Sequence, residues 1–266
     1  MEAMHLPDAI DLVRPAVVQV LLDEQPSGAK PIGTGFIVTD GGHVLTARHV
    51  AEDAEAAINQ RGARLLVGLA MPTLSGPITM RQGFELTEVE VAIKDPRHDL
   101  AVLLMRNHPF RSGRIPGVHR TPDGGIGINA LYGVAALNPQ TPRDGESVAV
   151  SGYPLSEATL ITTSGHVATA AGVDLQEVHP PGAPDWFTFP DAKDSYLIDV
   201  AVNPGNSGGP VFKTYTGEVI AVCVAFRVAM GQAGPSAVFA YNSGLAVAVP
   251  IQYGIELVRS LQPAGG

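Results

Sequence analysis

Short apolar runs separated by turn residues dominate the hydrophobic pattern of this 266-residue chain. The runs are too short for long helices and rich in β-branched residues, which is typical of buried strands. In the N-terminal half, strands are predicted at 16–22, 32–39, 43–46, 64–70, 86–93 and 100–105. In the C-terminal half, they are predicted at 148–152, 159–168, 196–202, 219–228 and 245–249.

Helical signals are confined to short segments. Asp8 is expected to cap a helix that Pro15 ends. A second short helix is expected to continue through Asn59, and apolar residues at helical spacing predict a third at 251–261. Strands therefore dominate both halves, with the boundary between them somewhere between 105 and 148.

Two long segments, 107–143 and 171–195, carry no periodic pattern, and we expect both to be irregular. The stretch 106–120, at the start of the first segment, carries four arginines and two histidines, which favour a solvated loop over a docking patch for an acidic partner. The second contains three aromatic residues that we expect to fold over the second half of the chain rather than to meet a partner: Trp186, Phe187 and Phe189.

Composition agrees with an all-β chain. Charged residues make up only 16%, whereas there are 30 Gly and 22 Pro, so many short strands joined by turns are favoured. The net charge of -9 argues against general binding to nucleic acid or anionic membrane. A single cysteine, Cys223, excludes an internal disulfide framework. Because we find neither a signal peptide nor an apolar stretch long enough for a transmembrane helix, we expect a cytoplasmic protein.

The segment 203–210 (NPGNSGGP) places three glycines and two prolines around Ser207. A serine hydroxyl is a poor nucleophile unless it is held beside a general base. Glycine allows the turn conformations that such a loop requires, and the N–H groups of Gly205 and Ser207 can converge on one developing oxyanion. The alternative is a turn between two strands, because the same residue types favour turns. An upstream base and acid would decide between the two.

His49 is the candidate base, because it ends an apolar strand at the point where a turn or helix begins. Asp99 is the candidate acid, since a carboxylate at the start of an apolar strand needs hydrogen-bond donors such as an imidazole. Asp95 competes with it but lies farther from the apolar run, and His98 is expected to point away from the site. The order His49, Asp99, Ser207 along the chain is that of chymotrypsin.

The chain resembles the chymotrypsin-like serine proteases, and most closely the HtrA-like protease domains. The segments that carry the resemblance span the chain in the family's order: 14–18 (RPAVV), 33–38 (GTGFIV), 45–50 (LTARHV), 99–103 (DLAVL) and 203–210. The resemblance implies two six-stranded antiparallel Greek-key β-barrels of chymotrypsin type with a short C-terminal helix. It divides one protease domain, 1–266, into a barrel at about 16–105, a connecting loop at about 106–145, a barrel at about 146–250 and a helix at about 251–262.

The resemblance also implies peptide-bond hydrolysis without a cofactor or metal, through the triad His49, Asp99 and Ser207 with an oxyanion hole at Gly205 and Ser207. The extended substrate is expected to pair with the strand at 224–226. The residues assigned to substrate binding are Ala201, Val224, Ala225 and Phe226. Since no acidic residue is evident there, small or medium apolar P1 residues are favoured.

Several residues depart from the family pattern. Arg48 brings a charge next to the candidate base, and we expect it to point to solvent. Asn206 lacks the charge with which secreted zymogens bind a newly cut N-terminus, so we expect loop ordering rather than N-terminal cleavage to control activity. The chain ends too soon after Pro250 for a PDZ module, and its connecting segments are longer than usual. Loops 106–145 and 171–195 are the candidate sites for a regulatory protein partner.

Two other functions remain open. The chain could be a latent or non-catalytic peptide-binding module that needs a partner before the oxyanion hole forms. It could also be an esterase that uses the same three residues. Metal and nucleotide chemistry have little support, since no metal-binding spacing occurs and the pair Gly125 and Gly127 lacks a flanking strand and helix.

Overall fold

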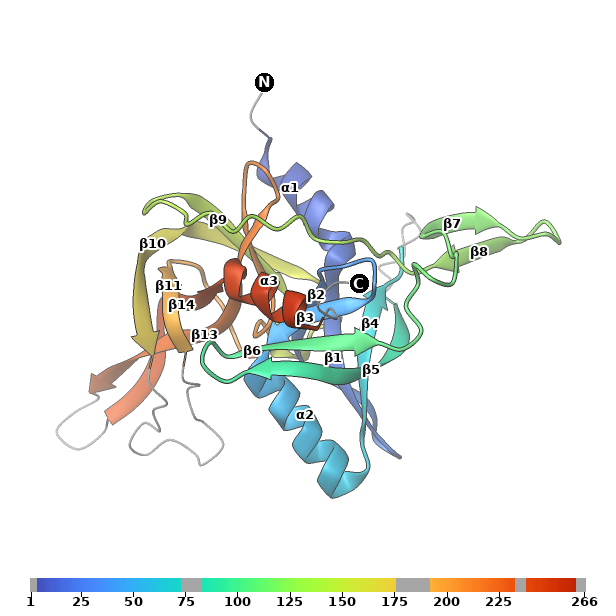
Figure 1. Cartoon of the computed structure of the whole chain (residues 1–266), viewed down its shortest axis with the longest axis horizontal. Helices are drawn as coiled ribbons and strands as arrows, with labels where there is room; N and C mark the ends of the chain where they lie inside the picture. The colour runs from blue at the N-terminus through green and yellow to red at the C-terminus, as the bar shows by residue number, and fades with distance from the viewer. Residues whose placement is uncertain (1–3, 73–82, 176–191, 233–237, 262–266) are drawn as a thin grey trace.

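Two closed β-barrels lie side by side in the computed structural model, which describes residues 4–72, 83–175, 192–232 and 238–261 (Figure 1). Each barrel has six strands, and every neighbouring pair within it is antiparallel. The expected fold, an all-β chain of two six-stranded barrels with a C-terminal helix, is confirmed.

The first barrel closes in the order β1-β2-β3-β6-β5-β4. Its strands are β1 (Val17–Glu24), β2 (Gly28–Ile37), β3 (His43–Ala47), β4 (Arg64–Ala70), β5 (Phe84–Asp95) and β6 (Leu100–Met105). β6 is apolar along its whole length because one face points into the barrel and the helices at 48–61 and 251–260 cover the other. Its leucines Leu100 and Leu103 are fully buried together with Phe36 and Leu45.

The second barrel closes in the order β10-β11-β14-β13-β12-β9. Its strands are β9 (Ser147–Gly152), β10 (Ile161–Leu175), β11 (Ala192–Ile198), β12 (Pro210–Lys213), β13 (Val219–Gln232) and β14 (Val238–Pro250). β12 begins directly after the glycine-rich segment that contains Ser207, so the barrel holds the end of that segment in place.

Two segments that we expected to be irregular contain regular structure. Within 107–143, β7 (Gly117–Arg120) and β8 (Ile126–Asn129) form a two-stranded hairpin that projects away from the barrels (Figure 1). Most of its side chains are exposed, so it has no buried face to produce an apolar pattern in the sequence. Within 171–195, β10 continues to Leu175 and β11 begins at Ala192. The three aromatic residues of that segment lie outside the described residues.

The main helices are α1 (Leu6–Val13), α2 (Arg48–Arg61) and α3 (Ile251–Ser260). Two short 3-10 helices, η1 (Arg14–Ala16) and η2 (Pro154–Ser156), precede β1 and follow β9. The expectation that Asp8 caps the first helix is wrong. Leu6 begins that helix, His5 occupies the N-cap without a side-chain hydrogen bond, and Asp8 lies in the first turn, where a carboxylate favours the helix dipole.

Each terminal helix contacts the barrel that is distant from it in sequence. α1 precedes the first barrel, yet Leu12 lies against Gly217 in the turn between β12 and β13, where an added Cβ would be 3.4 Å from its side chain. α3 follows the second barrel, yet it lies beside β3 (Figure 1), and Gly254 packs directly on Leu45. The two barrels are therefore joined at both ends of the chain.

Candidate active site

His49 and Asp99 form a close pair in the first barrel. β3 ends at Ala47 and α2 begins at once, which places His49 in the first turn of the helix. Asp99 lies in the turn before β6 with a left-handed backbone (φ 55), a conformation that aspartate tolerates better than most residues. Its Oδ2 is 2.8 Å from His49 Nδ1, and its Oδ1 accepts the His49 backbone N–H at 3.0 Å. The competing acid, Asp95, pairs with His98 instead.

Arg48 lies beside the same carboxylate. Asp99 is fully buried, and a buried carboxylate is costly unless donors or opposite charges surround it. Arg48 Nε is 3.6 Å from Asp99 Oδ1, and the Arg48 backbone N–H donates to the Asp99 carbonyl at 2.9 Å. Only 18% of the Arg48 side chain is exposed. The expectation that Arg48 points to solvent is therefore wrong, because the negative charge of Asp99 draws the guanidinium inward.

Opposing influences act on the pKa of His49. Burial lowers this pKa, whereas the charge of Asp99, its hydrogen bond to the ring and the charge of Asp53 raise it. The Arg48 charge lowers it. The net result is a pKa above the ordinary value of 6.5, while 30% of the His49 side chain remains exposed. The ring is thus both oriented by a carboxylate and accessible to another molecule.

The loop that carries Ser207 belongs to the second barrel but is bound to the first. Thr34, a fully buried residue of β2, donates its N–H to the Ser207 carbonyl at 2.9 Å and its hydroxyl to the Gly205 carbonyl at 2.6 Å. The hydroxyl also accepts the Tyr153 N–H at 3.0 Å. Sequence reasoning missed Thr34, although it stands between two glycines in one of the segments that carry the family resemblance. The two glycines that flank Thr34 were the sequence signal that could have identified it.

The N–H groups of Gly205 and Ser207 donate no hydrogen bond to any residue in the described part of the chain. Gly205 has a left-handed backbone (φ 102), which only glycine adopts readily. The preceding peptide is held by its carbonyl, because Pro204 O accepts the N–H of Leu155 at 2.8 Å. Leu155 was also missed, and its own left-handed backbone (φ 56) is not foreseeable from its residue type. Both N–H groups are thus left available to an external acceptor.

The Ser207 hydroxyl lies 3.4 Å from the carbonyl of Val224, to which it can donate. No hydrogen bond joins it to His49 among the described residues. The backbone of Ser207 nevertheless lies beside the start of α2, since Gly33 packs against both the Ser207 carbonyl and Val50. The structure therefore brings His49 and Asp99 into contact and places Ser207 next to the helix that carries His49, with its hydroxyl near the Val224 carbonyl of β13.

The residues assigned to substrate binding divide into two groups. Val224 is a buried residue at a β-bulge in β13, and Ala225 and Phe226, which follow it, are half-buried. β12 pairs with β13 only as far as Val222, so the 224–226 segment extends beyond the end of β12. Ala201, by contrast, is exposed, and its carbonyl accepts a hydrogen bond from a threonine of β10.

Cys223 is part of the core of the second barrel. It is buried, and burial raises the pKa of its thiol to about 12, so it is not a competing nucleophile. Among the residues that the structure describes, no cluster of His, Cys, Asp and Glu could hold a metal ion. None of the helices in the described ranges has both the length and the hydropathy needed to cross a membrane.

Comparison with known proteins decides the family. The trypsin-like peptidase domain matches residues 33–222, a stretch that contains His49, Asp99 and Ser207. The chain belongs to the trypsin-like peptidase family. Solved structures with the fold of this family are also similar to the chain. The HtrA-type protease AlgW with decapeptide has a TM-score of 0.59 at 18% identity, over 96% of this chain and 67% of that chain.

Curated relatives of this trypsin-like peptidase are named as DegP-like. A "probable periplasmic serine endoprotease DegP-like" of Brucella suis biovar 1 is 27% identical over 243 residues, which cover 91% of this chain and 35% of the relative. A protein of the same description from Rhizobium meliloti is 26% identical over 230 residues, covering 86% and 33%. The chain thus spans about a third of the length of these relatives.

The names of these relatives contradict one expectation from the sequence. We expected a cytoplasmic protein, because we found neither a leader nor a membrane segment. The relatives are described as periplasmic, and they point to that compartment instead. The expectation of a cytoplasmic location is wrong, because the lack of a recognisable leader or membrane segment in a sequence does not determine the compartment of the protein.

Proposed function

We propose that this chain is a serine endopeptidase that cleaves polypeptides through an acyl-enzyme. Ser207 attacks the scissile carbonyl, and His49 takes the hydroxyl proton and later gives it to the leaving amine. Asp99 keeps the imidazole in the tautomer that leaves Nε2 free to accept the proton. The observation that carries the proposal is the His49–Asp99 pair, at 2.8 Å, beside a serine loop that Thr34 bonds to the same barrel.

In this proposal the N–H groups of Gly205 and Ser207 bind the oxyanion of the tetrahedral intermediate. Neither donates to a described residue, and the bond from Leu155 to Pro204 keeps the peptide before Gly205 in its present orientation. Each such donor contributes roughly 3 kcal/mol of transition-state stabilisation. Water then attacks the acyl-enzyme and releases the second product, with His49 again acting as the base.

The substrate is proposed to be an extended peptide that pairs with the 224–226 segment of β13. This segment lies beyond the end of β12 and includes the Val224 carbonyl next to Ser207. The solved HtrA-type protease AlgW is described with a decapeptide, which accords with a polypeptide substrate. Because Ala201 is exposed and uncharged, we retain the preference for small or medium apolar P1 residues.

Control by loop ordering rather than by N-terminal cleavage is part of the proposal. Asn206 is buried and uncharged, so it offers no partner for the ammonium group of a new N-terminus. The matching test compares the peptidase rate of the chain before and after N-terminal trimming. Strict dependence on trimming would refute this form of control.

A latent site is the second candidate, and one observation favours it. The Ser207 hydroxyl lies 3.4 Å from the Val224 carbonyl and makes no hydrogen bond to His49 in the described chain, so the serine and its base are not engaged with each other. In free enzymes, catalytic hydrogen bonds are often long and tighten only when substrate binds. A latent protein would complete this step only with a partner bound.

A fluorophosphonate probe separates the two candidates. An active endopeptidase is labelled in the wild type and in the control Ser112→Ala, and loses the label in Ser207→Ala. A latent module is labelled only after a partner or peptide is added. Absence of label under every condition would exclude the endopeptidase and favour the non-catalytic peptide-binding module. Parallel assays with matched amide and ester substrates then test for an esterase, which would cleave only the ester.

A further inference from the structure

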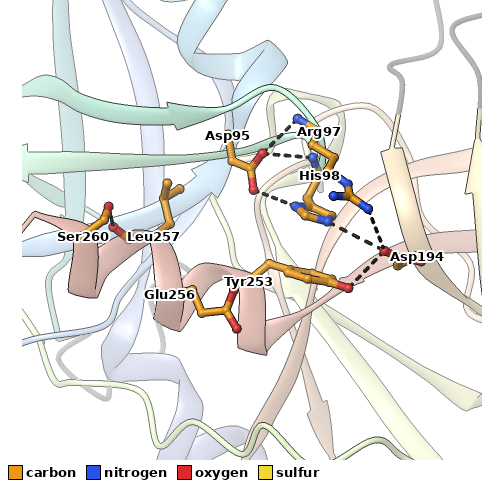
Figure 2. Close-up of a pocket in the computed structure, with 8 residues that line it drawn as sticks. All are labelled: Asp95, Arg97, His98, Asp194, Tyr253, Glu256, Leu257 and Ser260. Carbon is orange, nitrogen blue, oxygen red and sulfur yellow. Dashed lines mark hydrogen bonds and ion pairs between the residues drawn. The ribbon is translucent and has the colours of Figure 1, made fainter.

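A cluster of four side chains, which we call the His98 latch, joins the turn before β6 to the second barrel. Its members are Asp95, His98, Asp194 and Tyr253, and they line an open pocket of about 360 Å³ (Figure 2). His98 Nδ1 is 2.6 Å from Asp95 Oδ2, and its Nε2 is 3.9 Å from Asp194 Oδ2. The Tyr253 hydroxyl donates to the same Asp194 oxygen at 3.1 Å. His98 is thus enclosed by two carboxylates.

The ring of His98 is held on its face as well as at its edge. It stacks on the ring of Tyr253 in α3, with centroids 3.6 Å apart and an interplanar angle of 11° (Figure 2). Only 7% of His98 is exposed, although it lies in a turn, where polar side chains usually reach solvent. Its buried Nε2 makes no hydrogen bond within the described chain. Such an arrangement restricts the ring to one position.

His98 directly precedes Asp99, and the two side chains face opposite sides of the turn. Asp95 organises this turn, because its Oδ1 accepts the backbone N–H groups of Arg97 and His98 at 2.9 Å and 3.4 Å. The following residue, Asp99, has the left-handed backbone that directs its carboxylate to His49. His98 and Asp99 share a peptide bond, so the bonds that hold His98 also restrict the backbone from which the Asp99 side chain reaches His49.

The latch also connects the turn to the barrel that carries Ser207. The Lys193 N–H of β11 donates to the Arg97 carbonyl at 3.2 Å, next to Asp194. β11 pairs with β14, which pairs in turn with β13, the strand whose Val224 carbonyl accepts the Ser207 hydroxyl. The acid and the serine come from different barrels, so a contact between the barrels at Asp99 affects their relative position.

We propose that His98 is a positioning residue, which sets the position of Asp99 through its bonds to Asp95 and its contacts with Asp194 and Tyr253. This inference rests on the proposed peptidase function, and it extends the site beyond the three reacting residues. Loss of the latch should weaken the His49–Asp99 hydrogen bond and slow the chemical step, with little effect on the binding of peptide.

The decisive variant is His98→Phe, which keeps a ring to stack on Tyr253 and removes both nitrogens. We expect kcat to fall about tenfold while KM stays within about twofold, since an orienting contact acts on the transition state rather than on substrate binding. His98→Gln, whose amide can again donate to Asp95, should recover part of the lost kcat. His119→Phe, on the exposed β7, is the matched control and should leave both constants unchanged.

A second measurement does not depend on activity. The proton between His49 Nδ1 and Asp99, whose heavy atoms are 2.8 Å apart, should give a strongly deshielded NMR signal, which His98→Phe should shift or broaden and His119→Phe should not. An unchanged signal together with an unchanged kcat would overturn the proposal, even if the melting temperature fell. If the wild type cleaves no peptide, the proposed function fails, but the NMR signal still tests the latch.

Milder variants cover the case in which His98→Phe does not fold. Tyr253→Phe keeps the stacked ring and removes only the hydroxyl that binds Asp194, and Asp194→Asn removes the charge that faces His98. Each should change the His49–Asp99 proton signal in the same direction as His98→Phe. If neither variant changes the signal or kcat, the latch has no part in positioning Asp99.

Discussion

The hydroxyl of Thr34 donates to the carbonyl of Gly205 at 2.6 Å, across the boundary between the two barrels. Thr34 belongs to β2 of the first barrel, and Gly205 belongs to the serine loop of the second. The same hydroxyl accepts the Tyr153 N–H, so one buried side chain bonds to two segments of the second barrel. The relative position of the serine loop and His49 therefore depends on Thr34, which has no role in the proposed chemistry.

Replacement of Thr34 by valine tests this dependence. Thr34→Val keeps the shape of the side chain but leaves the Gly205 carbonyl and the Tyr153 N–H without their partner, at a cost of about 1–3 kcal/mol for each buried group. We expect a lower melting temperature and at least a tenfold slower fluorophosphonate labelling of Ser207. Thr34→Ser keeps the hydroxyl and serves as the control. Equal labelling of Thr34→Val and wild type would contradict the prediction.

Gly205→Ala should lower the peptidase kcat severely, with a smaller effect on the melting temperature. The residue has φ 102, and a Cβ there would lie 2.5 Å from the Tyr153 carbonyl, so the loop must move. Loss of one oxyanion donor lowers kcat by about 10²–10³. Gly62→Ala is the matched control, because Gly62 also has a positive φ (65) but meets nothing within 4 Å. Steady-state peptidase kinetics and thermal melts on both variants check the prediction.

The charge of Arg48 should affect the pH dependence of activity. In the proposed mechanism, only neutral His49 can accept the Ser207 proton, so the rate should rise with pH through the His49 pKa. This pKa lies above 6.5, and Arg48 holds it lower than it would otherwise be. Arg48→Gln should therefore move the acid limb of the kcat/KM profile to higher pH. Arg61→Gln, at the far end of α2, should leave the limb in place. A shift to lower pH in Arg48→Gln would refute the assignment.

Cys223 should be unreactive in the folded protein. Burial raises the pKa of its thiol to about 12, so the reactive thiolate is scarce at pH 8 and is shielded from reagents. We expect iodoacetamide to modify Cys223 only at the rate of unfolding, and rapidly in denaturant. Because it is the sole cysteine, intact-protein mass spectrometry reports it directly. Rapid modification under native conditions would show that β13 opens locally.

The sequence was most informative where the strands are buried on both faces. β4 and β6 were predicted with the bounds that the structure has, because their apolar runs are continuous and end at polar residues or turns. The hairpin β7–β8 was missed, since exposed strands bury no face and leave no hydrophobic pattern. The extension of β10 was missed for a similar reason, because none of residues 169–174 is buried. The start of β11 was missed because its buried residues, Ala192 and Ser195, are small and form no apolar run.

Motif order located the residues of the site but not the contacts between them. His49, Asp99 and Ser207 were singled out because each stands at the end of an apolar run or within a glycine-rich turn. Arg48 was placed wrongly, because local sequence does not show that a buried carboxylate lies nearby. Thr34 and His98 have partners more than 90 positions away along the chain, and such pairings arise only when the barrels pack together.

Because α1 and α3 each contact the barrel that is distant from them in sequence, the two barrels should unfold together. Separating the two barrels would break the contact between Leu12 and Gly217 at one end of the chain and the contact between Gly254 and Leu45 at the other. Neither barrel can therefore separate or unfold without also breaking a helix contact with the other barrel. Heating should therefore produce a single melting event, and a nick in the stretch that links the barrels should leave two fragments that stay together until both melt.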